Sequence, residues 1–127
     1  MARIFLSMSG EGRGHASRIG SLLECLRRRH ELMVFAPALA YDLLVEPCQR
    51  MGVALQAIPG IVNRYKDDKS FDVWGTVADV VPYALELPHV LSRVEEVVRR
   101  ERPDLVVTDF EPILPRAAAR CDVPFIS

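Results

Sequence analysis

The sequence predicts a doubly wound α/β domain, in which helices cover both faces of a parallel sheet. Apolar runs of strand length alternate along the chain with segments of helical periodicity, and this alternation is typical of strands joined by right-handed crossovers. Half of the 127 residues are hydrophobic, and the chain is long enough for one domain with a substantial core. The expected strand order is 3-2-1-4-5.

Five segments have the character of buried strands, because they are short, rich in aliphatic and aromatic side chains and poor in charge. The predicted strands are Arg3–Met8, Glu31–Ala36, Val53–Pro59, Leu105–Thr108 and Phe125–Ser127. A strand cut off this early is an unusual end for a parallel sheet. We therefore expect the chain to be the front part of a longer protein; the alternative is a complete small five-stranded domain.

Most of the segments between the strands predict helices. Residues from His15 to about 29 keep helical spacing, and the arginine triplet at 27–29 closes that helix, where cations suit the helix dipole. A second helix from Leu39 to Met51 is expected to be interrupted by Pro47. The helix nearest the end of the chain, Pro112–Cys121, is rich in small residues and precedes the last strand.

The region between the third and fourth strands has a looser pattern. Residues 60–71 are charged and lack a clear period, which predicts a loop. Asp72 is expected to cap a helix whose apolar face carries Trp74 and the valines near it, packed in the core or against a neighbouring domain. Pro82 and Pro88 then break the pattern, and another helix, Val90–Arg102, follows them.

A glycine-spaced turn joins the first strand to the first helix. Residues 9–15 read Ser-Gly-Glu-Gly-Arg-Gly-His. The glycines allow a tight backbone, and the free N–H groups of the following helix point into the turn, where a phosphate oxygen or a developing alkoxide is favoured. His15 adds an imidazole, the side chain best suited to take or give a proton near neutral pH.

The expected topology brings a second polar segment to the same place. Strands one and four are neighbours where the winding reverses, and ligands bind there beyond the carboxyl ends of the strands. The turn after strand four contains Asp109 and Glu111. A carboxylate beside an imidazole fixes its tautomer and makes it a better base. We therefore predict His15 and Asp109 as a catalytic pair; the alternative for Asp109 is to cap the next helix.

The other candidate residues surround this pair and would contact the substrate. Arg18 lies one turn beyond His15 and could meet an anion, although a solvated helix face explains it equally well. The full predicted substrate-binding set is Gly10, Glu11, Gly12, Arg13, Gly14, Arg18 and Glu111.

Composition and missing motifs exclude several classes of protein. A net charge of −1 gives no electrostatic case for nucleic acid. The three cysteines are scattered, as expected for reduced thiols in the cytoplasm, and no residues have metal-ligand spacing. No apolar stretch approaches the ~20 residues that span a bilayer. The chain also lacks a dinucleotide fingerprint, a P-loop and a G-x-S-x-G nucleophile elbow.

The segment Ser9–Arg18 resembles the first loop of GT-B nucleotide-sugar glycosyltransferases, especially the bacterial branch similar to the peptidoglycan N-acetylglucosaminyltransferase, which has a Gly-Gly-His type loop there. The segments Pro103–Asp109 and Val123–Ser127 also fit this family. The resemblance implies a Rossmann-like, acceptor-binding N-terminal domain (residues 1–127), with a C-terminal domain, absent here, that binds most of the nucleotide-sugar donor. Without that domain, the chain alone is expected to be inactive.

The resemblance also implies metal-independent transfer of a sugar to a hydroxyl, with the nucleotide-sugar as co-substrate and no other cofactor. His15 would be the general base, oriented by Asp109, while Gly12 and Gly14 face the donor diphosphate or acceptor oxygens. Because some family members use a carboxylate as base, Glu11 or Asp109 could take that role. If the acceptor is a lipid, the segment from Trp74 to residue 91 would allow a peripheral contact with the inner face of the membrane.

Two further interpretations remain open. The chain could be the acceptor-side or membrane-recruiting subunit of a split glycosyltransferase that works with a separate donor-binding chain. It could also be a non-catalytic Rossmann-type domain that binds a small ligand in the same crevice.

Overall fold

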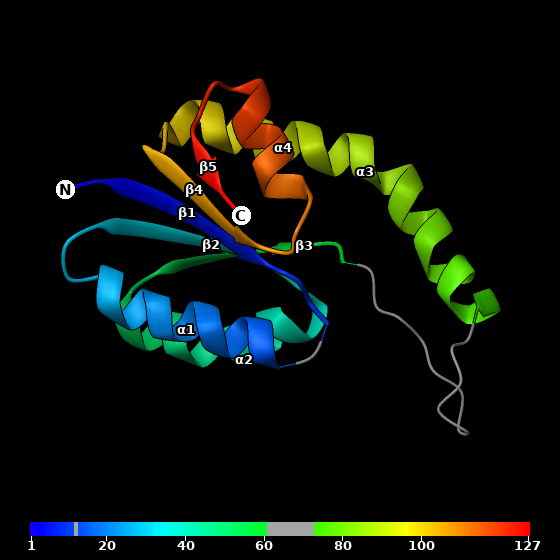
Figure 1. Ribbon diagram of the computed structural model, residues 1–127, viewed down its shortest axis with the longest axis horizontal. Coiled ribbons are helices and arrows are strands. Elements are labelled where there is room, and N and C mark those ends of the chain that lie inside the picture. The colour runs from blue at the N-terminus through cyan, green and yellow to red at the C-terminus, as the bar shows by residue number, and fades with distance from the viewer. Residues whose placement is uncertain (12, 61–72) are drawn as a thin grey trace.

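The computed structural model describes residues 1–11, 13–60 and 73–127 and contains a five-stranded sheet between two pairs of helices (Figure 1). In chain order the elements are β1 (Arg3–Met8), α1 (Gly14–Leu26), β2 (Glu31–Pro37), α2 (Ala38–Met51), β3 (Ala54–Ile58), α3 (Val73–Glu101), β4 (Leu105–Asp109), α4 (Ile113–Arg120) and β5 (Phe125–Ile126). The predicted fold class is confirmed.

All strand pairs are parallel, and the strand order is β3-β2-β1-β4-β5, as the sequence predicts. In the central pair, Ser7 of β1 lies opposite Thr108 of β4, and Met8 lies opposite Asp109. The winding reverses between these two strands. Their carboxyl ends therefore meet at one edge of the sheet, which is where α/β proteins of this topology place their ligands.

Each face of the sheet has its own apolar core, because successive side chains of a strand point to opposite faces. On one face, Ile4, Leu6 and Met8 of β1 pack against α1 and α2. On the other face, Phe5 of β1 and Phe35 of β2 pack against α3 and α4. Figure 1 shows this division, with α1 and α2 below the sheet and α3 and α4 above it.

Proline does not end either helix in which the sequence predicts a break. Pro47 lies inside α2, and Pro82 and Pro88 lie inside a single helix, α3. Each proline removes one backbone hydrogen bond. Apolar side chains before and after Pro47 and Pro88 hold those helices against the sheet, whereas at Pro82 only the residues that follow the proline do so. Figure 1 shows that α3 bends along its length, as expected for a helix that contains proline.

Other differences from the predictions concern boundaries and burial. Helix α1 ends at Leu26, so the arginine triplet follows the helix instead of closing it; the chain turns there because Arg29 and His30 both donate to the carbonyl of Leu26. Trp74 is not in the core, because the residue is 82% exposed. The first half of α3 extends beyond the sheet (Figure 1). Its apolar face, which carries Trp74, Val77, Val81 and Leu85, is therefore exposed among the described residues.

Some sequence predictions fall outside the described residues. These are the role of Gly12, the loop from residue 61 to 71 and the helix cap at Asp72.

Candidate functional site

The glycine turn is fixed to the end of β4 and to the end of β2. The backbone N–H of Ser9 donates to the carbonyl of Asp109 at 2.8 Å, which extends the β1–β4 pairing beyond Met8. Gly10 is buried, and a Cβ atom there would lie 2.9 Å from the carbonyl oxygen of Pro37. Gly10 is therefore required by packing, and its backbone positions the turn over the sheet edge.

His15 and Asp109 meet across the gap between α1 and β4. The His15 Nδ1 atom lies 2.9 Å from Oδ2 of Asp109, and both side chains are mostly buried, with 29% and 19% exposed. Despite the short distance, Nδ1 makes no hydrogen bond to any described residue. The close approach that the sequence predicts is therefore present.

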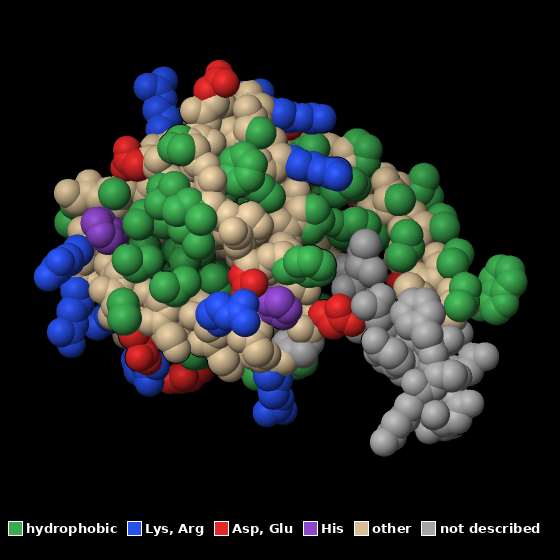
Figure 2. All heavy atoms as spheres, viewed as in Figure 1, with side chains coloured by type: hydrophobic (Ala, Val, Ile, Leu, Met, Phe, Trp, Pro, Cys, Tyr) green, Lys and Arg blue, Asp and Glu red, His purple; other side chains and the backbone are tan. Residues whose placement is uncertain are grey.

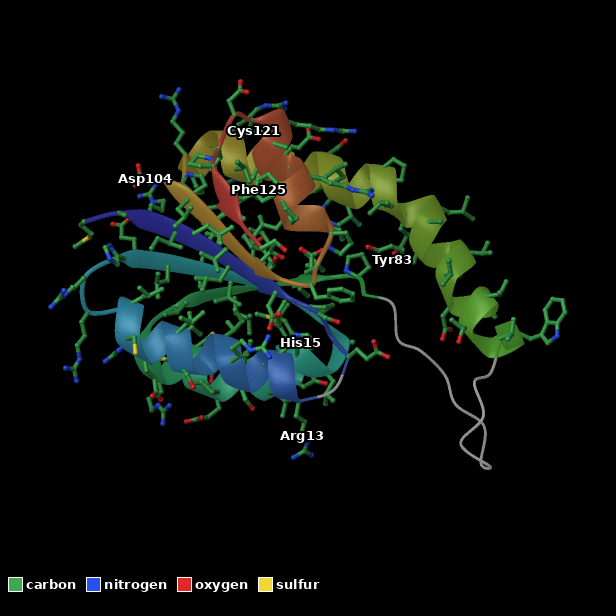
Figure 3. All side chains as sticks on the ribbon, viewed as in Figure 1. Arg13, His15, Tyr83, Asp104, Cys121 and Phe125 are labelled. Atoms are coloured by element: carbon green, nitrogen blue, oxygen red, sulfur yellow. The ribbon has the colours of Figure 1, made fainter. Side chains whose placement is uncertain are left out.

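Arg18 contacts the same carboxylate oxygen. Its Nη1 atom donates to Oδ2 of Asp109 at 2.7 Å, one helical turn after His15, and 65% of its side chain remains exposed. Asp109 thus accepts from a guanidinium and faces an imidazole at one oxygen. Figure 2 shows this grouping at the centre of the view, where a histidine lies beside basic and acidic side chains at the position that Figure 3 labels His15.

Glu111, not Asp109, caps the next helix. Its two carboxylate oxygens accept from the backbone N–H groups of Ile113 at 2.5 Å and Leu114 at 3.0 Å, at the start of α4. Because Glu111 is only 5% exposed, burial raises the pKa of its carboxyl, although these two hydrogen bonds oppose the change. Both oxygens are used inside the protein, which gives Glu111 a structural role at this site.

An open, mostly apolar cavity of about 510 Å³ adjoins these residues at the carboxyl edge of the sheet. It lies between the ends of β1 and β4, the end of β3 and the middle of α3; Figure 3 labels Tyr83 of α3 and Phe125 of β5, which line it. Burial raises the pKa of the Tyr83 hydroxyl, and the nearby charge of Glu111 raises it further. A volume of this size is in the range of small-molecule sites.

The cavity and the His15–Asp109 pair are neighbours with one residue between them. Neither His15 nor Asp109 lines the cavity, whereas Phe110 does. The Phe110 ring also stacks on the His15 ring, with 6.4 Å between centroids and 15° between planes. Phe110 was not among the residues predicted from the sequence, although an apolar residue between two acidic ones at the end of a strand was a usable signal.

The remaining predicted residues lie at different distances from this centre. Glu11 and Glu111 line the cavity, and so does Ser9, which was not predicted as a site residue. Gly14 begins α1, and Arg13 precedes it with no side chain capping the helix. Figure 3 shows Arg13 pointing away from His15, so it does not join the pair in this conformation.

The fold and the site define a class: a doubly wound α/β domain with a histidine and an aspartate at the topological switch point, beside an apolar cavity. The model of glycosyl transferase family 1 matches residues 2–127, and the chain therefore belongs to that family. No curated protein matches the sequence.

Solved structures support the same assignment of fold. Acinetobacter baumannii MurG shares 11% identity at a TM-score of 0.67, over 98% of this chain and 34% of that one. SsfS6, a glycosyltransferase of Streptomyces sp. SF2575, shares 19% identity at a TM-score of 0.61, over 98% and 38%. Glycosyltransferase VinC, solved in complex with DTDP, shares 17% identity at a TM-score of 0.59, over 97% and 33%.

The chain thus spans about a third of the length of these structures. A Neisseria meningitidis UDP-GlcNAc 2-epimerase has the same fold over 97% of this chain, at 13% identity and a TM-score of 0.57, so the fold alone does not define the reaction. In the described ranges, no helix is both long and apolar enough to cross a bilayer. No three metal-binding side chains come together among the residues with described positions.

Proposed function

We propose that this chain is the acceptor-side domain of a glycosyltransferase that moves a sugar from a nucleotide-sugar to a hydroxyl group. The observation that carries this proposal is the 2.9 Å approach of His15 Nδ1 to Asp109 Oδ2 at the switch point of the sheet. With Nδ1 facing the carboxylate, Nε2 is the nitrogen that would accept the proton of the acceptor hydroxyl. Asp109 would stabilise the imidazolium that forms.

The transfer needs no metal in this proposal, and the glycine turn would face the leaving diphosphate. The first turn of α1 has no side-chain cap, and its N–H groups favour an oxygen that gains negative charge. Arg18 would add a positive charge close to the reacting centre, in addition to its contact with Asp109. A Cβ added at Gly14 would meet no atom within 4 Å, so the space beside this turn is open to a ligand.

A second α/β domain would complete the site by binding most of the donor. The similar glycosyltransferases are about three times as long as this chain, which is consistent with a two-domain enzyme. A split enzyme with a separate donor-binding chain is the alternative, and the reading frame that contains this sequence distinguishes the two. In either case this domain alone should bind UDP- or TDP-sugars weakly, as calorimetric titration would measure.

A peripheral membrane contact would follow if the acceptor is a lipid. The exposed side chains of Trp74, Val77, Val81 and Leu85 along α3 support a contact of this kind, as they do a contact with a second domain. Figure 2 shows apolar side chains along the outer part of α3. Co-sedimentation of the full-length protein with lipid vesicles, which Trp74→Ser should weaken, would test the contact.

Replacing His15 tests the central proposal. In the full-length protein, His15→Ala should lower the rate of nucleoside diphosphate release from UDP- or TDP-sugars in the presence of acceptor by ~10²–10⁴-fold, the usual contribution of a general base. The thermal unfolding midpoint should stay near that of wild type. His89→Ala, at an exposed position on α3, is the matched control. A His15→Ala rate within a few-fold of wild type would remove His15 from the chemistry.

A further inference from the structure

Phe110 combines an exposed ring with a strained backbone. Its side chain is 81% exposed, and its φ angle is 60°, in the left-handed region. A bulky residue at positive φ is an outlier, and such residues concentrate at sites where function requires them. A glycine or asparagine would adopt this backbone more easily, so local structure does not explain the phenylalanine.

The surrounding hydrogen bonds hold Phe110 in this conformation. On one side, the carbonyl of Asp109 accepts from Ser9; on the other side, the carbonyl of Glu111 accepts from the Thr108 hydroxyl at 3.0 Å. The side chain of Asp109 therefore contacts α1, and that of Glu111 accepts hydrogen bonds at the start of α4. The ring between them projects from the protein surface.

The ring lies where two functional features meet. It stacks on His15 and also lines the apolar cavity, which neither His15 nor Asp109 does. A group bound in the cavity beside Phe110 therefore lies close to the imidazole. The other side chains that line the cavity include Tyr83, Phe125 and several prolines, which favour flat apolar groups over hydrated ones.

We propose that Phe110 determines acceptor specificity by stacking on an aryl group, so that the cavity selects hydroxyaryl compounds and directs their hydroxyl toward His15. The delivery of the hydroxyl rests on the proposed transfer function, whereas the selection of an aryl group does not.

The probes for this test are 2-naphthol and its saturated counterpart decahydro-2-naphthol, which carry the same hydroxyl on an aromatic and an aliphatic frame. Their affinities for the full-length protein are measured by calorimetry without donor. Phe110→Leu keeps an apolar side chain and should weaken 2-naphthol binding by about 3- to 10-fold, the value of one aromatic contact, while decahydro-2-naphthol binding changes less than twofold. Phe110→Tyr keeps an aromatic ring and should therefore keep the wild-type preference for 2-naphthol over decahydro-2-naphthol.

The strained backbone supplies an independent readout. Phe110→Gly removes the side chain and tolerates positive φ, so its urea midpoint should equal or exceed that of wild type although 2-naphthol binding is weakened. Equal loss of both probes in Phe110→Leu, or an unchanged 2-naphthol affinity, would overturn the proposal, as would a lowered midpoint in Phe110→Gly. If the aryl preference follows Phe110 but no donor is turned over, the transfer function fails and the specificity assignment stands.

Discussion

Glu111→Gln should change the pH dependence of stability, because Glu111 is a buried carboxyl whose pKa is raised by burial. Its ordinary pKa is 4.5. Above that value the unfolded chain loses this proton while the folded protein keeps it, so Glu111 lowers the stability of the wild type as pH rises toward its raised pKa. Within this window the loss is at most about 1.4 kcal/mol per pH unit for one group.

The neutral amide of Gln has no such dependence. At pH 4 the variant should be about 1 kcal/mol less stable than wild type, because only one amide oxygen replaces two carboxyl oxygens at the N–H groups of Ile113 and Leu114. This deficit should shrink or reverse as pH rises toward 7.5.

Urea unfolding followed by circular dichroism at four pH values would measure the difference. With a slope of about 1–3 kcal/mol per molar urea, 1 kcal/mol corresponds to a midpoint shift of roughly 0.3–1 M. Glu96→Gln, at an exposed position of α3, removes the same charge without a buried cap and serves as the control. A deficit in Glu111→Gln that is constant, or that grows with pH, would refute the reasoning. It would mean that the hydrogen bonds from α4 lower the pKa of Glu111 more than burial raises it.

Two other predictions concern packing and thiol reactivity. Gly10→Ala should destabilise the domain by about 1–3 kcal/mol, because its Cβ would lie 2.9 Å from the Pro37 carbonyl oxygen. The Cβ of Gly14→Ala would meet no atom within 4 Å, so this variant should be neutral or stabilising. Equal unfolding midpoints for the two variants would contradict this prediction. Cys48 is 1% exposed and burial raises the pKa of its thiol, so under native conditions it should react with a thiol reagent far more slowly than the exposed Cys25. Labelling followed by peptide mass spectrometry measures both rates, and similar rates would show that α2 opens readily.

The main features of the fold could be predicted because they depend on local periodicity. Strand-length apolar runs alternate with helical segments, and the handedness of their connections leaves few topologies. The order β3-β2-β1-β4-β5 follows, and it brings His15 and Asp109 to neighbouring strand ends although they are far apart in the sequence. The predicted proline breaks were wrong. At Pro47 and Pro88 core packing on both sides of the proline holds the helix together, which local propensity cannot register.

The details of the site depend on contacts that no local pattern encodes. The two acidic residues after β4 have different partners, because the backbone turn at Phe110 sends Asp109 toward α1 and Glu111 under α4. From the sequence, capping and pairing were equally reasonable for Asp109, since both need only a carboxylate after a strand. Likewise Arg18 contacts Asp109 only because α1 lies against the end of β4.

The sequence by itself therefore determined the sheet, its strand order and the edge where the polar residues gather, because hydrophobic periodicity and crossover handedness are properties of the chain. Only the tertiary structure decided between pairing and capping for Asp109, placed an aromatic ring against both the histidine and the cavity, and left one face of α3 exposed. Those features depend on distances between segments remote in sequence, which are set when the two apolar cores close on the sheet.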